Sequence, residues 1–110
     1  MIQINIWEDQ RQQIKEFLVK GHAGYGEEGW DVVCAAISAL TISALNGLME
    51  YVSIPLDVEM KDGYVHCILP EKISKLQSIQ SQAILQTMNL AFENVMSEYG
   101  KYVKINKIKL

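Results

Sequence analysis

The stretch Ile2-Gln3-Ile4-Asn5-Ile6-Trp7 alternates apolar and polar side chains, which is the pattern of a half-buried β-strand. A second strand is predicted at residues 14–19, and Glu8 to Arg11 has the right length for a hairpin turn between the two. The alternation returns at residues 102–108, which predicts a last strand. These strands indicate a sheet with one buried face.

Two helices are predicted between the strands. The segment from Trp30 to about Tyr51 is rich in alanine and leucine, and its apolar residues fall nearly all the way round, so we expect a central, largely buried helix. Residues 71–99 predict a long amphipathic helix, which Gly100 follows at its C′ position. Its apolar positions at helical spacing are Ile73, Leu76, Ile79, Ala83, Ile84, Met88, Ala91, Val95 and Tyr99.

Two further strands, 56–60 and 64–69, flank Lys61-Asp62-Gly63, and the Asp-Gly pair is a hairpin signal. Pro55 and Pro70 bound this unit. The resulting order is ββαββαβ, in which two helices pack on one face of a mostly antiparallel sheet. The sequence therefore predicts an α+β fold, with residues 1–110 as a single domain.

Composition narrows the function classes. The net charge of −3 disfavours nucleic-acid binding, and the lysines at 101, 104, 107 and 109 fit a solvated strand edge. The N-terminus lacks the basic and apolar regions of a secretion signal, and no uninterrupted apolar run approaches the ~18 residues of a membrane span. We therefore expect a cytoplasmic protein that does not enter a membrane, with Cys34 and Cys67 as free thiols.

The connection at residues 21–29 holds four glycines, Gly21, Gly24, Gly26 and Gly29. Ordering so many glycines costs chain entropy, so the segment is either a floppy link with a tight turn or a functional loop. Phosphate binding is disfavoured, because the Gly21–Gly24 stretch fits neither the P-loop nor the dinucleotide fingerprint.

A histidine and a cysteine flank this loop. Cys34 falls in the first turns of the predicted helix, where the helix dipole and unpaired N–H groups favour a thiolate. His22, on a loop that folds back over that end, is suited to take the thiol proton and later protonate a leaving amine. The alternative is that Cys34 is a small buried core residue, as free cysteines usually are.

Other polar residues have open roles. Asp31 in the first helical turn either caps the backbone or orients the imidazole. Ser38, one turn beyond Cys34, either lines the site or faces the core with its hydroxyl bonded to the preceding turn. His66 and Cys67 are adjacent in a strand and point to opposite faces, with Cys67 on the core side. Their spacing matches no zinc motif, so no metal or cofactor is expected.

Part of the chain resembles the ribosomal-processing cysteine proteases of the Prp family. The matching segments are Gly21-His22-Ala23-Gly24-Tyr25-Gly26 and Gly29-Trp30-Asp31-Val32-Val33-Cys34-Ala35-Ala36-Ile37-Ser38-Ala39-Leu40. The family signature is a Gly-His-Ala loop followed by Asp-Ile/Val-Val-Cys-Ala-Ala-Val/Ile-Ser. Length, element order, Asn46-Gly47-Leu48 and the Leu69-Pro70 strand end extend the resemblance over nearly the whole chain, and Trp30 is a mild departure.

The resemblance implies a catalytic dyad of Cys34 and His22. It also implies a homodimer that removes a short N-terminal extension from a ribosomal protein, the twenty-seventh of the large subunit, in bacteria such as Firmicutes. Helix N-terminal N–H groups would stabilise the oxyanion. The competing hypothesis is a non-catalytic, ribosome-associated binding module. The loop would act as a flap over the substrate, and its binding residues would be Gly21, Ala23, Gly24, Tyr25, Gly26 and Gly29.

Overall fold

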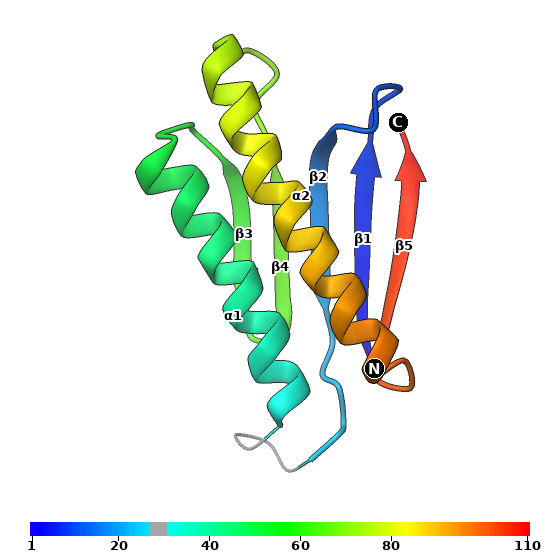
Figure 1. Ribbon diagram of the computed structural model, residues 1–110. Helices are drawn as coiled ribbons and strands as arrows, with labels where there is room; N and C mark the ends of the chain where they lie inside the picture. Colours follow the sequence, from blue (N-terminus) through cyan, green and yellow to red (C-terminus); the bar gives the residue numbers. More distant parts are fainter. Residues whose placement is uncertain (27–30) are drawn as a thin grey trace.

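Five strands form one mixed sheet in the computed structural model of the protein, which describes residues 1–26 and 31–110 (Figure 1). The sheet order is β3-β4-β2-β1-β5; β1 pairs with β5 in parallel, and the other neighbours are antiparallel. The strands are β1 (Ile2–Glu8), β2 (Ile14–Lys20), β3 (Asp57–Lys61), β4 (Tyr64–Ile68) and β5 (Val103–Lys109).

Both helices lie on the same face of the sheet (Figure 1). Helix α1 (Val32–Asn46) continues into a wider π-helical turn, η1 (Gly47–Tyr51), and α2 (Lys75–Glu98) crosses the sheet beside it. The predicted ββαββαβ order and α+β class are therefore confirmed. The predicted helix start at Trp30, like Gly29 of the loop, lies outside the described residues.

The start of α2 differs from the prediction. The helix begins at Lys75 rather than Glu71, because Ser74 caps it. The Ser74 hydroxyl accepts a hydrogen bond from the Gln77 N–H, and the Gln77 side chain accepts one from the Ser74 N–H, each at 3.0 Å. This reciprocal capping box satisfies two N–H groups that an earlier start would have left unpaired.

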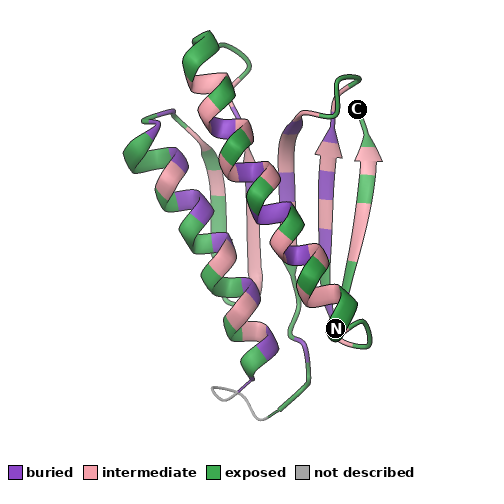
Figure 2. Cartoon of the chain, viewed as in Figure 1, coloured by how far each residue is buried: buried purple, intermediate pink, exposed green. Residues whose placement is uncertain are grey.

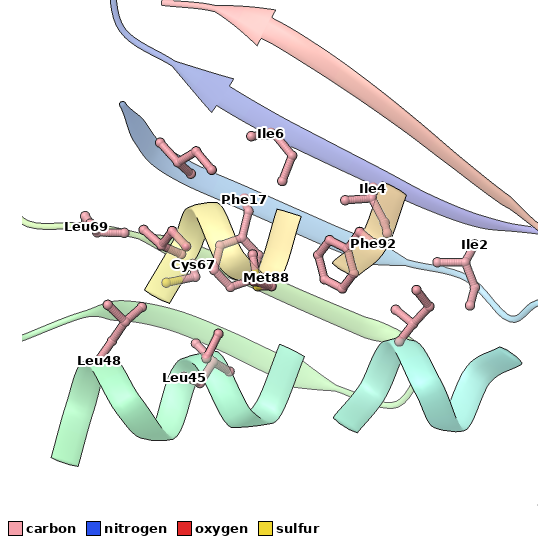
Figure 3. Packing of buried hydrophobic residues seen from close by; sticks show 14 of the residues in the cluster. Ile2, Ile4, Ile6, Phe17, Leu45, Leu48, Cys67, Leu69, Met88 and Phe92 are labelled. Atoms are coloured by element: carbon pink, nitrogen blue, oxygen red, sulfur yellow. The ribbon is translucent and has the colours of Figure 1, made fainter. Parts of the chain in front are cut away.

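The core lies between the helices and the inner face of the sheet (Figure 3). Ile2, Ile4 and Ile6 all point inward from β1, as their alternation predicted, and each is at most 2 % exposed. The helices contribute Leu45, Leu48, Leu85, Met88 and Phe92, and the neighbouring strands contribute Phe17 and Cys67. Cys67 is thus a core residue, as predicted.

Burial of the helices follows the two-layer architecture. Buried residues on both helices alternate with exposed ones, as Figure 2 shows. The prediction that the first helix is central and largely buried was wrong for its outer side, where Val32 and Ile42 are 55 % and 45 % exposed. Leu76 and Ile79 of α2 were likewise expected inside and are exposed.

The segment Val32–Tyr51 has a mean hydropathy of 1.9, so its length and composition alone would suit a membrane span. In the fold it is a helix packed on a sheet, with Val33, Ile37 and Leu45 buried in the common core. Its hydropathy is therefore accounted for by packing on one side and by the exposed apolar residues on the other.

Three chain segments meet at one end of the molecule: the end of β2, the β3–β4 hairpin and the start of α1 (Figure 1). The Gly21 N–H donates a hydrogen bond to the Gly63 carbonyl oxygen at 2.8 Å, which ties the loop to the hairpin. Gly21 has a φ of +98°, and a Cβ there would lie 2.4 Å from the Met1 carbonyl oxygen. Only glycine fits at position 21, and this junction fixes the position of the backbone of His22, the next residue.

Candidate active site

Asp31 organises the start of α1. Its Oδ1 accepts hydrogen bonds from the N–H groups of Val33 and Cys34, each at 3.0 Å. Its Oδ2 accepts from the N–H groups of Tyr25 at 3.0 Å and Gly26 at 3.5 Å. These hydrogen bonds, that of Cys34 first, hold the pKa of the Asp31 carboxyl below its ordinary value of 3.8 although burial opposes them. The geometry therefore favours the capping alternative for Asp31 and adds a second role, in holding the loop.

Cys34 lies in the first turn of α1 with a half-buried side chain. Its Sγ accepts a hydrogen bond from the backbone N–H of Ala23 at 3.2 Å. An N–H aimed at sulfur stabilises the thiolate more than the thiol, since the charged acceptor binds the donor more strongly. The loop thus contributes one N–H directly to the sulfur, which lies at the positive end of the α1 dipole.

His22 is part of the loop and lies beside the β3–β4 hairpin. Its side chain is 58 % exposed, and its Nε2 lies 3.9 Å from Oδ2 of Asp62. Within residues 1–26 and 31–110, no hydrogen bond joins the imidazole to the Cys34 thiol. Both side chains nevertheless line the same groove, so the two predicted catalytic groups are neighbours across one opening.

The groove has a volume of about 460 Å³ and runs between α1 and the β3–β4 hairpin. Its walls are mostly apolar, with Ile37 and Ile42 on the helix side and Met60 and Val65 on the strand side. A second hollow of similar volume adjoins it on the loop side, lined in part by Gly24, Gly26, Asp31 and Ala35. Three residues line both hollows: His22, Cys34 and Ser38.

Ser38 is exposed and faces these hollows, so the alternative in which its hydroxyl faces the core is wrong. Tyr25 occupies a different place. Its ring packs edge-on against Tyr99, with centroids 5.5 Å apart, and against Tyr102 at 5.1 Å. Tyr25 therefore anchors the loop to the end of α2 and does not line either hollow.

The second cysteine and histidine lie away from the groove. Cys67 is fully buried, and this burial, with smaller effects of Asp57 and Glu16, raises the pKa of its thiol to about 12. His66 makes a 2.6 Å contact between its Nε2 and the Glu16 carboxylate. Among the described residues, no three His, Cys, Asp or Glu side chains gather in a way that would hold a metal ion.

Sequence reasoning missed two residues beside His22. Asp62 approaches the imidazole, and Gly63 lies so close that an added Cβ would be 2.8 Å from Nε2. The Asp-Gly pair was recognised only as a turn signal. No local pattern reveals that a hairpin so distant in sequence will meet the glycine loop.

A cysteine and a histidine across one groove, with the sulfur at a helix start, form the kind of site on which cysteine hydrolases are built. Residues 1–104 match the model of a family described as cysteine protease Prp, and the chain belongs to that family.

Relatives from two bacteria support this membership. The chain is 27 % identical over 106 residues to the ribosomal processing cysteine protease Prp of Staphylococcus aureus, covering 96 % of this chain and 98 % of that protein. It is 26 % identical over 107 residues to the Bacillus subtilis protein of the same name, covering 96 % of each.

Solved structures agree with the fold. The S. aureus protease in complex with a covalently linked product peptide superposes with a TM-score of 0.88 at 28 % identity, over 97 % of this chain and 99 % of that one. The same protease with a substrate peptide gives a TM-score of 0.81 at 27 % identity, with the same coverage. A Streptococcus mutans protein gives 0.79 at 25 % identity, over 100 % of this chain and 96 % of that one.

Proposed function

We propose that this protein is a cysteine endopeptidase that removes the N-terminal extension of a large-subunit ribosomal protein, the twenty-seventh, with Cys34 as nucleophile and His22 as base. The observation that carries the proposal is that His22 and Cys34 line one groove, with the Ala23 N–H donating to Sγ. The names of the relatives, which are ribosomal processing proteases, support this choice of substrate. The whole unit of residues 1–110 acts as one protease domain.

The reaction begins with transfer of the Cys34 proton to the His22 imidazole. The thiolate then attacks the scissile carbonyl carbon, and the imidazolium returns its proton to the departing amine as the peptide C–N bond breaks. A thioester remains on Sγ. Water attacks it, His22 takes a proton from that water, and the carboxylate product leaves as the thiol reforms. The imidazole and Sγ must come within hydrogen-bonding distance when substrate binds, since no hydrogen bond joins them within the described residues.

Three of the helix N-terminal N–H groups that were expected to stabilise the oxyanion already have acceptors. The N–H groups of Val33 and Cys34 already donate to the Asp31 carboxylate, and that of Ala35 donates to the Asp31 carbonyl oxygen. The Ala23 N–H, which points at the attacking sulfur, lies near the position where a bound carbonyl oxygen would develop charge. In this mechanism Ala23 supplies the main donor, and the part of the loop that carries Gly24 and Gly26 closes over the peptide.

The extension binds in an extended form along the groove between α1 and the β3–β4 hairpin. The apolar walls formed by Ile37, Ile42 and Met60 suit an apolar side chain next to the cut. Ser38, exposed at the junction of both hollows, is placed to hydrogen-bond the peptide backbone. Tyr25, which packs on Tyr99 and Tyr102, supports the loop from behind.

The enzyme works as a homodimer in the cytoplasm, where ribosomes mature. Exposed apolar side chains on the two helices support a partner surface, since Ile42, Leu76 and Leu90 are 45 %, 63 % and 62 % exposed. The net charge of −3 supports recognition of a protein segment rather than RNA. Light scattering on the purified protein should give twice the mass of one chain, and a monomer at micromolar concentration would contradict the dimer.

A cleavage assay tests the proposed function. The wild-type protein is incubated with a synthetic peptide that spans the extension and its junction, beside Cys34→Ala, Cys34→Ser and His22→Ala. Mass spectrometry should find one cut with wild type and none with the three variants, while circular dichroism shows that all four are folded. An intact peptide that binds wild type would instead support the non-catalytic binding module, and cleavage by Cys34→Ala would exclude Cys34 as nucleophile.

A further inference from the structure

Two carboxylates lie near the site, and it is Asp62, not Asp31, that approaches His22. Both oxygens of Asp31 are occupied by backbone N–H groups, from Val33 and Cys34 on one side and from Tyr25 and Gly26 on the other. The carboxylate that approaches His22 belongs to Asp62, with 3.9 Å between Oδ2 and Nε2.

The fold holds Asp62 and His22 together from both sides. The β3–β4 hairpin is closed by the pairing of Lys61 with Tyr64, and Gly63 at its tip has a φ of +65°. The Gly63 carbonyl oxygen accepts the N–H of Gly21, the residue directly before His22. The imidazole also lies over Gly63, where a Cβ would be 2.8 Å from Nε2. The hairpin tip therefore packs against the His22 ring, and the Asp62 carboxylate lies at the edge of this contact.

We infer that Asp62 is a positioning residue for His22 in the peptidase reaction, an inference that rests on the proposed function. The Asp62 carboxylate favours the tautomer with hydrogen on Nε2, which leaves the lone pair of Nδ1 free to accept the Cys34 proton. After that transfer both ring nitrogens carry hydrogen, and the carboxylate stays ionised and stabilises the imidazolium. No proton passes to Asp62.

The neighbouring cation, Lys61, contacts groups other than Asp62, so the Asp62 carboxylate is available for this role. The ammonium group of Lys61 lies 3.4 Å from the Glu59 carboxylate and 4.7 Å from the centre of the Tyr64 ring. The Asp62 side chain is 90 % exposed, so water screens its effect on His22. When a peptide fills the groove, which both residues line, it displaces that water and strengthens the interaction.

The inference is tested with Asp62→Ala, Asp62→Asn and Asp62→Glu on the extension peptide. Asp57→Asn is the matched control, because it removes another exposed carboxylate from the same hairpin and leaves the Glu59–Lys61 ion pair intact. For Asp62→Ala we expect kcat to fall about tenfold, less than the factor of 10² to 10⁴ that a general base itself contributes, with KM within about twofold. Asp62→Glu should recover part of the loss, Asp62→Asn should lie between Asp62→Ala and Asp62→Glu, and Asp57→Asn should match wild type. A raised KM with unchanged kcat would make Asp62 only a groove wall and would overturn the inference, as would an equal loss in Asp57→Asn.

A second measurement separates this inference from the proposed function. Nitrogen-15 NMR of the imidazole reports which ring nitrogen of His22 carries hydrogen in the free protein, without any substrate. Asp62→Ala should shift the His22 signals away from the Nε2–H tautomer, and Asp57→Asn should leave them unchanged. If wild type cleaves nothing, the proposed function fails while this measurement still decides the contact; identical His22 signals in wild type and Asp62→Ala would overturn it.

Discussion

The backbone N–H of Ala23 donates a hydrogen bond to Sγ of Cys34 at 3.2 Å, so the loop that carries His22 also contacts the proposed nucleophile directly. One short segment therefore brings both the proposed base and an N–H dipole to the start of α1. The two contributions depend on the same loop position, because His22 and Ala23 are consecutive. Movement of the loop should change the reactivity of Cys34 and the position of the His22 imidazole together.

The two thiols should differ in reactivity. We expect Cys34 to react with iodoacetamide near neutral pH faster than Cys67 by on the order of 10² or more, because only the thiolate attacks the reagent. Cys34 is half-buried and lines the groove, whereas Cys67 is fully buried with a pKa raised to about 12. Time-resolved mass spectrometry of the labelled peptides measures both rates. Equal, slow labelling would show that Cys34 is not activated.

Adding a methyl group at Gly63 should disturb the site. In Gly63→Ala the new Cβ would lie 2.8 Å from Nε2 of His22, at a backbone φ of +65°. We expect kcat/KM on the extension peptide to fall, and the left-handed backbone to cost about 1–2 kcal/mol of folding free energy. Urea denaturation and peptide kinetics measure the two effects.

Gly47→Ala is the control for Gly63→Ala. Its Cβ would approach the Ile84 side chain, with Cδ1 nearest at 3.1 Å, and Gly47 does not line the groove. This variant should keep the wild-type kcat/KM. If Gly63→Ala also kept the wild-type kcat/KM, activity would not depend on the packing of the His22 ring against the hairpin tip.

Asp31 should make the stability of the protein depend on acidic pH. Its folded pKa is lowered from 3.8, so the ionised carboxylate stabilises the folded state above that pH, and this contribution disappears as pH falls through the folded pKa. Asp31→Asn keeps a capping side chain but lacks the titration. The difference in unfolding free energy between wild type and Asp31→Asn should be constant above about pH 5 and shrink below it. Chemical denaturation at a series of pH values tests this, and a pH-independent difference would contradict it.

A substitution in the core should destabilise the protein far more than a substitution at a nearby exposed position. Phe92 on α2 is fully buried, so Phe92→Ala should destabilise the protein by about 3–5 kcal/mol. Leu90, two residues earlier and 62 % exposed, is the matched position, and Leu90→Ala should stay within about 0.5 kcal/mol at concentrations where the chain is monomeric. Thermal unfolding of both variants at dimer-saturating and dilute concentrations would also show whether Leu90 stabilises a dimer.

The strands and their order along the chain could be predicted because alternation is a local property. The Ile2, Ile4 and Ile6 pattern identified both the strand and its buried face, and the Asp-Gly pair located the hairpin at Asp62. The extent of burial could not be predicted for the first helix. A helix with apolar residues all round, such as Ile42 on the outside, looks the same in sequence whether two layers or three surround it.

The candidate site divides in the same way. The positions of Cys34 at a helix start and His22 on a glycine-rich loop were accessible from local signals. The partners of Asp31 were not, because a carboxylate at an N-cap bonds either to the helix or to a ring, and only the three-dimensional path of the loop decides this. The approach of Asp62 to His22 depends on a contact between two separate turns, which no residue pattern records.

The pairing of β1 with β5 has a consequence during synthesis. Ile2 donates its backbone N–H to the Tyr102 carbonyl oxygen, and β1 lies beside β5 over its whole length. On the ribosome, a nascent chain carries β1 as a bare strand edge until β5, which begins at Val103, has been synthesised. The chain that is proposed to trim a ribosomal component thus completes its own sheet only after β5 has left the ribosome. Until then β1 is open to mispairing with neighbouring nascent chains on a polysome.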